Sequence, residues 1–250
     1  LSSSANHIFD ITVGVGSDSG LYSSVSNQKS KKLNIYNQMA QVLVGYDHTG
    51  SIQRFDEDGD ILAGGNKLDN GFFMNFARLL SKDEIKKGTF ELELGVTPAY
   101  DQSGANTFAN RIKLTDASGS DGYLVNSPVG EYGVLYATQS AGLNILAADK
   151  SYAVGLLFYQ AGVAVITGSI FNRVSSGGIL TDATGNVSMS GPSATTEPLN
   201  AVLTGSTIET FADNLRTRMY NLQFNNTVEL NSSVYFCRVN HNEFNYSTNP

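Results

Sequence analysis

The fold is decided by the stretch Tyr152-Ala153-Val154-Gly155-Leu156-Leu157-Phe158-Tyr159, which Gln160-Ala161-Gly162 joins to Val163-Ala164-Val165-Ile166-Thr167. Two apolar runs flanking a short segment that contains Gly are typical of a β-hairpin. Both runs are apolar on each face, and strands of this kind are covered on both sides. We therefore expect this hairpin to lie deep in a stack of β-sheets.

Shorter strands are expected on either side of this hairpin. Clusters of Gly, Asn, Asp and Ser separate runs of alternating or continuous apolar residues, which indicates strands and turns. The expected strands are Ile8–Val13, Thr89–Leu94, Arg111–Thr115, Gly133–Ala137, Val228–Leu230 and Val234–Val239. The pattern predicts a mainly antiparallel β fold, β-sandwich-like, over a single domain of residues 1–250.

About three short helices are expected to interrupt the strands. Apolar stripes at helical spacing run over Leu33–Val44, Phe72–Leu80 and Ile208–Met219. Thr207 is a suitable N-cap for the last of these. Ser81 and Glu84 have capping-box spacing, which predicts a further short helix over Lys82–Lys87. Residues 175–198 are rich in Gly, Pro and small polar residues, so we expect a loop excursion there.

The composition excludes several classes of protein. The 250 residues carry a formal net charge of −7, and the single cysteine rules out a disulfide framework or a cysteine-based zinc site. An acidic chain without basic runs is not expected to bind nucleic acid. The sequence also lacks an apolar stretch of the roughly 18–20 residues that cross a bilayer, so no membrane partner is expected. Because the chain opens with Leu1, we expect a processed product or a portion of a longer polypeptide.

The sharpest charge feature is Asp56-Glu57-Asp58-Gly59-Asp60. Alternate carboxylates around a Gly are typical of calcium loops, because a hard cation takes several oxygen ligands. The spacing does not fit an EF-hand, since the Gly falls fourth and the twelfth position is Lys67. A solvated turn explains the cluster at least as well. No metal site is assigned, and whether Asp56, Asp58 and Asp60 bind a cation stays open.

No catalytic or cofactor-binding residues are assigned. His7, His48 and His241 are scattered, and a Gly-x-Ser-x-Gly elbow is missing. Gly14-Val15-Gly16 lacks the third Gly and the following helix of a dinucleotide site. Cys237 lies in an apolar run, which favours a buried structural thiol.

Two further features have competing interpretations. Glu91 and Glu93 project from one face of a strand, as the carboxylate pair of a glycosidase would. Their alternation with apolar residues favours an ordinary solvated strand face instead. Phe244 and Tyr246, in a polar C-terminal segment, would suit an anchor onto a neighbouring subunit or a fold back over their own sheet.

Several segments together resemble a family of virion structural proteins of tailed phages, especially marine contractile-tailed phages such as cyanophages. The similar segments are Ile8–Ser19, Phe76–Phe90, Asn126–Tyr136, Val154–Thr167 and Val234–Pro250. They span nearly the whole chain in order, and Val234–Pro250 is the most distinctive. The resemblance implies no catalytic residues, and it implies a family whose chains continue beyond this Asn-Pro segment.

From the resemblance we expect a non-enzymatic structural component of a phage virion, in the neck, collar or tail, which assembles in the host cytoplasm. Its partners would be copies of itself and other virion proteins, and no cofactor is expected. Low charge suits such a structural role, and the absence of cysteine pairs suits assembly in a reducing cytoplasm. The alternatives are a host-recognition or carbohydrate-binding fibre module and a polysaccharide-degrading tailspike.

Overall fold

The computed structural model of the chain describes residues 8–19, 27–61, 67–96, 108, 110–141, 152–172, 179–180, 207–228 and 230–238. The strands are β1 (Asp10–Val15), β2 (Asn70–Asn75), β3 (Glu84–Ile85), β4 (Glu91–Gly95), β5 (Arg111–Thr115), β6 (Leu124–Ser127), β7 (Gly130–Ala141), β8 (Tyr152–Phe158), β9 (Val163–Thr167), β10 (Met219–Gln223) and β11 (Asn226–Thr227). The α-helices are α1 (Asn27–Leu43), α2 (Gly119–Gly122) and α4 (Ile208–Arg218), with 3-10 turns at Ala77–Leu79 and Gly168–Phe171.

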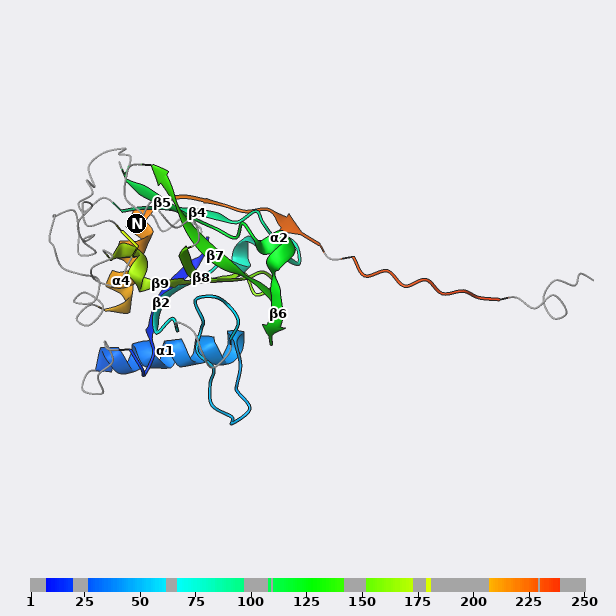
Figure 1. Cartoon of the computed structure of the whole chain (residues 1–250), viewed down its shortest axis with the longest axis horizontal. Helices are drawn as coiled ribbons and strands as arrows, with labels where there is room; N and C mark the ends of the chain where they lie inside the picture. The colour runs from blue at the N-terminus through cyan, green and yellow to red at the C-terminus, as the bar shows by residue number, and fades with distance from the viewer. Residues whose placement is uncertain are drawn as a thin grey trace, which may run out of the picture.

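The prediction of a mainly antiparallel β fold with about three short helices is confirmed. One curled sheet has the strand order β1-β2-β9-β8-β7-β5-β4-β10, with β6 beside β7, and its pairs are antiparallel. A separate two-stranded pair joins β11 to β3. The curled sheet wraps around its own core, as the two layers of a sandwich would (Figure 1).

The predicted hairpin is the centre of this sheet. Gly155 of β8 pairs with Ile166 of β9, and Phe158 pairs with Val163. All five residues of β9 are buried, because β8 and β2 flank it and both of its faces are covered. A central strand of this kind carries apolar residues on both faces, which is the pattern that predicted it.

One face of the central strands is covered by α1 and by described residues of the segment that follows it, 46–61 and 67–69. Tyr36, Ala40 and Leu43 of α1 are buried against this face. Phe55 from the following segment packs against Phe73 of β2, with ring centroids 5.5 Å apart. Figure 1 shows α1 lying across the sheet below β2 and β9. The amphipathic stripe that predicted this helix therefore faces the sheet.

The concave face of the sheet encloses the larger core, and α4 closes one side of it. Leu215 of α4 is fully buried in the same cluster as Leu92, Leu114 and Val13, which lie on three different strands. Arg218, at the end of the helix, is also buried, and its Nη1 donates to the Gly95 carbonyl at 3.0 Å. This hydrogen bond ties the end of α4 to β4, beside which β10 then pairs.

The predicted helix over Phe72–Leu80 is wrong. Its first half is β2, and only Ala77–Leu79 form a 3-10 turn. Phe72 belongs to the core of the concave face, whereas Phe73 packs under α1 on the opposite face. Adjacent apolar residues can be buried on opposite faces only in a strand, because successive side chains of a strand alternate.

The predicted helix over Lys82–Lys87 is also wrong. Glu84 and Ile85 form β3, and the Ile85 backbone N–H donates to the Tyr159 carbonyl at 3.1 Å. Pairing with β11 replaces the intrahelical hydrogen bonds that the capping-box spacing predicted. The pairing of β3 with β11 therefore overrides the capping-box spacing. Such spacing favours a helix only where no tertiary contact competes with it.

The predicted strands near the C-terminus are corrected as well. Strand pairing there is limited to β11 and ends at Thr227. Residues 230–238, the C-terminal arm, run outward from the body without pairing to any described strand (Figure 1). Of the predicted loop excursion, residues 175–198, only Ile179 and Leu180 are described, and both are buried.

Candidate functional site

The acidic loop, residues 56–60, brings its three aspartates together. One carboxylate oxygen each from Asp56, Asp58 and Asp60 lies within 4.8 Å of the other two. Asp56 is fully buried, whereas Asp58 and Asp60 are exposed. The cluster is therefore a pocket of negative charge that opens toward solvent and is closed at its inner end.

Lys67 partly neutralises this charge. Its Nζ donates to Oδ2 of Asp56, and the two residues face each other across an isolated β-bridge. Burial raises the pKa of Asp56, and the nearby Asp58 acts in the same direction against Lys67. The interaction with Asp56 lowers the pKa of Asp58, which therefore stays ionised. Lys67 thus contributes one ammonium group to a cluster of three carboxyl groups.

The loop is held in place by hydrogen bonds from the β6–β7 region. The hydroxyl of Tyr132 donates to the Gly59 carbonyl at 2.6 Å, and Nδ2 of Asn126 donates to the Asp60 carbonyl at 3.0 Å. Gly59 has a φ of 82°, and a Cβ there would lie 2.8 Å from Val134. Only glycine fits this turn, both for its left-handed backbone and for its close approach to the sheet.

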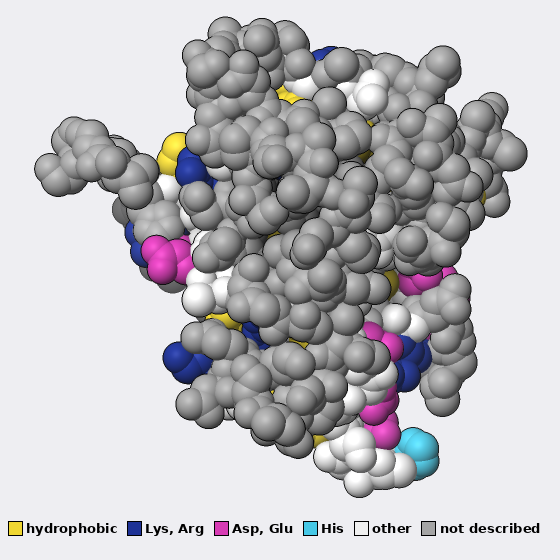
Figure 2. Space-filling model, turned by 90° about the vertical axis from the view of Figure 1, so that its left-hand side faces the viewer, with side chains coloured by type: hydrophobic (Ala, Val, Ile, Leu, Met, Phe, Trp, Pro, Cys, Tyr) yellow, Lys and Arg dark blue, Asp and Glu magenta, His cyan; other side chains and the backbone are white. Residues whose placement is uncertain are grey.

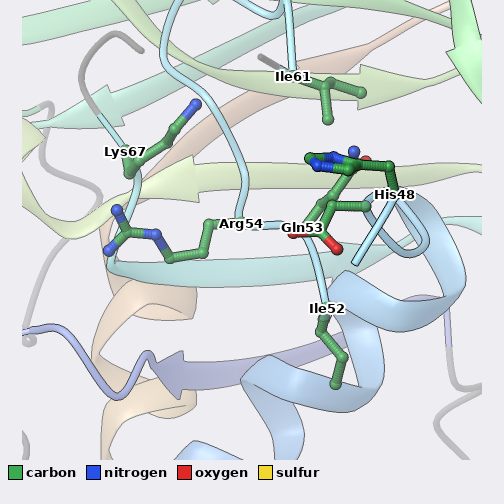
Figure 3. A pocket seen from close by; sticks show the side chains of 7 residues that line it. His48, Ile52, Gln53, Arg54, Ile61 and Lys67 are labelled. Atoms are coloured by element: carbon green, nitrogen blue, oxygen red, sulfur yellow. The ribbon is translucent and has the colours of Figure 1, made fainter. Parts of the chain in front are cut away.

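Beside the loop lies a hollow of about 570 Å³, lined by Asp47, His48, Ile52, Gln53, Arg54, Ile61 and Lys67. Figure 3 shows Arg54 and Lys67 on one side of this hollow and His48 and Gln53 on the other. Its lining side chains come mainly from the segment that covers the α1 face of the sheet. Arg54 and Lys67 of this lining are paired with carboxylates that lie outside it.

Arg54 is occupied by two carboxylates. Its Nη1 lies 2.7 Å from Oδ2 of Asp18 and 2.8 Å from Oδ1 of Asp69. Burial raises the pKa of Asp69, and Arg54 opposes the shift. The guanidinium joins the end of β1 to the start of β2 and to the intervening segment, so it clamps three parts of the chain. This role is structural.

Most of the other predicted site residues lie apart from the hollow. His48 is exposed on its rim, while His7, His241, Phe244 and Tyr246 lie outside the described residues. Gly14 serves packing: a Cβ there would lie 2.9 Å from the Cα of Tyr36, so its absence lets α1 approach β1. The prediction of a buried Cys237 is wrong, because this thiol is exposed on the C-terminal arm.

Glu91 and Glu93 do share a strand face, but that face is not simply solvated. Glu93 is buried, and its Oε2 accepts from Nε of Arg111 at 3.0 Å. Lys113 lies 2.8 Å from Oε1 of Glu91 and 3.8 Å from Oε1 of Glu93. Cross-strand ion pairs between β4 and β5 therefore use both carboxylates, which corrects the expectation of a free solvent-facing pair.

A second group of charged residues was missed by sequence reasoning. Asp116, which follows β5, is buried and accepts hydrogen bonds from the backbone of two residues and from the hydroxyl of Tyr159. Lys87 pairs with Glu131 and lies 3.4 Å from Oε1 of the buried Glu84. The sequence signal for the role of Asp116 is the turn-like Asp-Ala-Ser-Gly segment after β5, since Asp often accepts hydrogen bonds from nearby backbone N–H groups in turns.

Charges of opposite sign also lie side by side on the surface. Figure 2 shows magenta acidic groups next to dark blue basic groups on the described part of one face. Among the described helices, none is long and apolar enough to span a membrane. Comparison with known proteins gives no match to a family model, to a curated protein or to a solved structure.

Proposed function

We propose that this chain is a non-enzymatic structural subunit of a tailed-phage virion, in the neck, collar or tail, which works by assembling with copies of itself and other virion proteins. The observation that carries assembly is the C-terminal arm, residues 230–238. Its large apolar side chains are almost fully exposed: Leu230 at 88%, Tyr235 at 86% and Phe236 at 95%. The virion context rests on the resemblance of the sequence segments quoted above.

Exposure of this arm favours association. Burying one Leu, Val or Phe side chain stabilises a complex by about 1.5–3 kcal/mol before the entropic cost of ordering is subtracted. Leu230, Val234 and Phe236 would together contribute on the order of 6 kcal/mol on a partner surface. An extended segment of this kind suits strand addition, in which backbone hydrogen bonds and alternate side chains both bind the partner.

The charged groups of the body support a structural role. Arg54, Lys87, Arg111 and Lys113 each contact carboxylates that lie on a different segment of the chain. Such contacts fix the segments relative to one another. A body held together in this way, with a projecting apolar arm, suits a subunit that contacts its neighbours in a symmetric particle.

The experiment compares the full chain with a variant in which Leu230, Val234 and Phe236 are all replaced by Ser. Sedimentation velocity over a hundredfold range of concentration should show association of the full chain and a monomer for the variant. The unfolding midpoint of the variant should not change, because these side chains do not support the body. A matched control replaces Asn231, Ser232 and Ser233 of the same arm by Ala and should associate normally.

Particle location tests the other half of the proposal. Cryo-electron microscopy and mass spectrometry of purified phage particles should find this chain in the neck, collar or tail. A full chain that stays monomeric at every concentration, and that purified particles lack, would contradict the proposal.

The two alternatives stay predictions with their own tests. A host-recognition module should give signals on a glycan array, and a tailspike should release reducing sugar from a capsular polysaccharide. Two exposed rings that could line a sugar-binding face are already engaged: Lys87 lies 4.8 Å from the ring centroid of Tyr123, and Arg111 lies 4.1 Å from that of Tyr220. The carboxylates of β4 are likewise held in ion pairs.

A further inference from the structure

The acidic loop offers three oxygen ligands at the separation that one metal ion requires. The carboxylate oxygens of Asp56, Asp58 and Asp60 lie within 4.8 Å of one another. A Ca²⁺ ion binds oxygens at about 2.3–2.6 Å, so two of its ligands are at most about 5 Å apart. The three oxygens can therefore contact one ion without movement of the backbone.

A second observation, independent of this clustering, points to a ligand. The side chain of Asp56 is 0% exposed, and none of the residues that the structure describes gives its Oδ1 a hydrogen-bond partner. Lys67 satisfies only the other oxygen, Oδ2. A buried carboxylate oxygen without a partner is costly unless a donor or a positive charge satisfies it.

The charge balance leads to the same conclusion. Lys67 supplies one positive charge against three aspartates, and two of these aspartates are on the solvent side. A cation bound between carboxylates held this close would relieve their mutual repulsion. We propose that Asp56, Asp58 and Asp60 form a binding site for a divalent cation, Ca²⁺, in which water completes the coordination.

The loop is pre-formed for this role. Tyr132 and Asn126 hold the carbonyls of Gly59 and Asp60 from the side of the sheet. Each of these carbonyls accepts one hydrogen bond from the protein, and the three carboxylates with solvent are the ligands of the proposed site. Carboxylates carried on a loop suit Ca²⁺, whose coordination geometry is flexible, better than Mg²⁺, which demands near-ideal octahedral geometry. Because Lys67 reduces the net charge, we expect a dissociation constant of about 10⁻⁴–10⁻³ M.

Terbium luminescence tests the site directly, because the chain has no Trp and 12 Tyr. Tyr132 donates to the Gly59 carbonyl inside the acidic loop, so its ring lies close enough to sensitise a bound Tb³⁺ ion. Excitation of Tyr should give saturable Tb³⁺ emission from the full chain. Added Ca²⁺ should displace the signal at a lower concentration than Mg²⁺ does.

The key variant is Asp58→Asn with Asp60→Asn. Both side chains are exposed, so the variant should fold, which its unfolding midpoint verifies. We expect at least a tenfold loss of Ca²⁺ affinity by calorimetry and loss of the Tb³⁺ signal. The control, Asp83→Asn with Asp121→Asn, removes the same charge at two exposed positions elsewhere and should bind normally.

Two results would overturn the inference. One is the absence of saturable Ca²⁺ or Tb³⁺ binding to the full chain near neutral pH, which would leave Lys67 or a shared proton as the counter-charge of the loop. The other is binding that the Asp58→Asn, Asp60→Asn variant retains unchanged. Neither result depends on whether the chain is a virion protein, since the measurement needs only the isolated protein.

Discussion

Asp116 is the residue whose replacement tests most directly how the structure is held together. It follows β5 and is 1% exposed. Its Oδ2 accepts from the backbone N–H of Gly88 at 2.7 Å and from the hydroxyl of Tyr159 at 3.1 Å. Its Oδ1 accepts from the backbone N–H of Phe90 at 2.9 Å. One carboxylate thus joins the segment before β4, the end of β5 and the end of β8.

Asp116→Ala should lower the free energy of unfolding by about 3–4 kcal/mol. Gly88 is exposed, so its N–H can donate to water after the substitution. Phe90 and Tyr159 are buried, and their two donors would lose their acceptor. A buried donor without a partner costs about 1–3 kcal/mol, and bonds to a charged acceptor are at the upper end of this range.

Urea denaturation followed by circular dichroism measures this change, with Asp121→Ala as the control. Asp121 is exposed, so its replacement should alter the free energy of unfolding by less than about 0.5 kcal/mol. Tyr159→Phe should cost about 1 kcal/mol alone and much less in the Asp116→Ala background, because the two residues share one hydrogen bond. A loss below about 1 kcal/mol for Asp116→Ala would refute the reasoning.

The same carboxyl group gives the stability a dependence on pH. Burial raises the pKa of Asp116 above its ordinary value, although the donors around it oppose the shift. The folded state then binds this proton more tightly than the unfolded state does. Its contribution to stability is therefore fully present at acid pH, below the ordinary pKa, and is lost as the pH rises through the folded-state pKa. We therefore compare the free energy of unfolding of the unmodified chain with that of Asp116→Asn. The difference between the two should decrease as the pH rises through this window.

Three further outcomes are expected. Gly155→Ala should prevent folding or lower the free energy of unfolding by more than about 3 kcal/mol, because a Cβ there would collide with a backbone carbonyl of β9. Gly122→Ala is the control and should be tolerated, and thermal melts compare the two variants. Lys67→Met should lower the free energy of unfolding, measured by urea titration, by about 3–5 kcal/mol, because it leaves the buried carboxylate of Asp56 without its ion pair. Lys82 is exposed, so Lys82→Met should leave the free energy of unfolding nearly unchanged. At a concentration at which the chain is monomeric, Cys237 should react with a thiol reagent in the native protein as fast as it does in urea, and slow labelling of the monomer would contradict the exposed arm.

The central hairpin could be predicted because its signal is local and unambiguous. Val154 to Ile166 is apolar on both faces and contains a Gly-bearing turn, and such a run needs burial on both sides. The amphipathic stripes of α1 and α4 were predictable for the same reason, since the spacing of apolar residues marks one face of each helix. The antiparallel β class of the fold follows from these local patterns.

The run around Phe72 and Phe73 could not be assigned in this way. Its apolar residues satisfy a helical stripe and a doubly buried strand equally well. The presence of β9 and β1 on either side decided for a strand, and this pairing joins residues about 60 to 95 positions apart in the chain. Similarly, the apolar residues around Phe236 have the composition of a strand but have no described strand to pair with.

The sequence alone determined the class of the fold, the hairpin at its centre and the presence of an acidic loop at Asp56, because apolar periodicity and clustered charge are visible over a few residues. Only the tertiary structure decided that Asp56 is buried, that Lys67 pairs with it and that the C-terminal arm projects from the body. Burial and pairing depend on which distant segments meet, and the free energy that selects those contacts comes from the whole core.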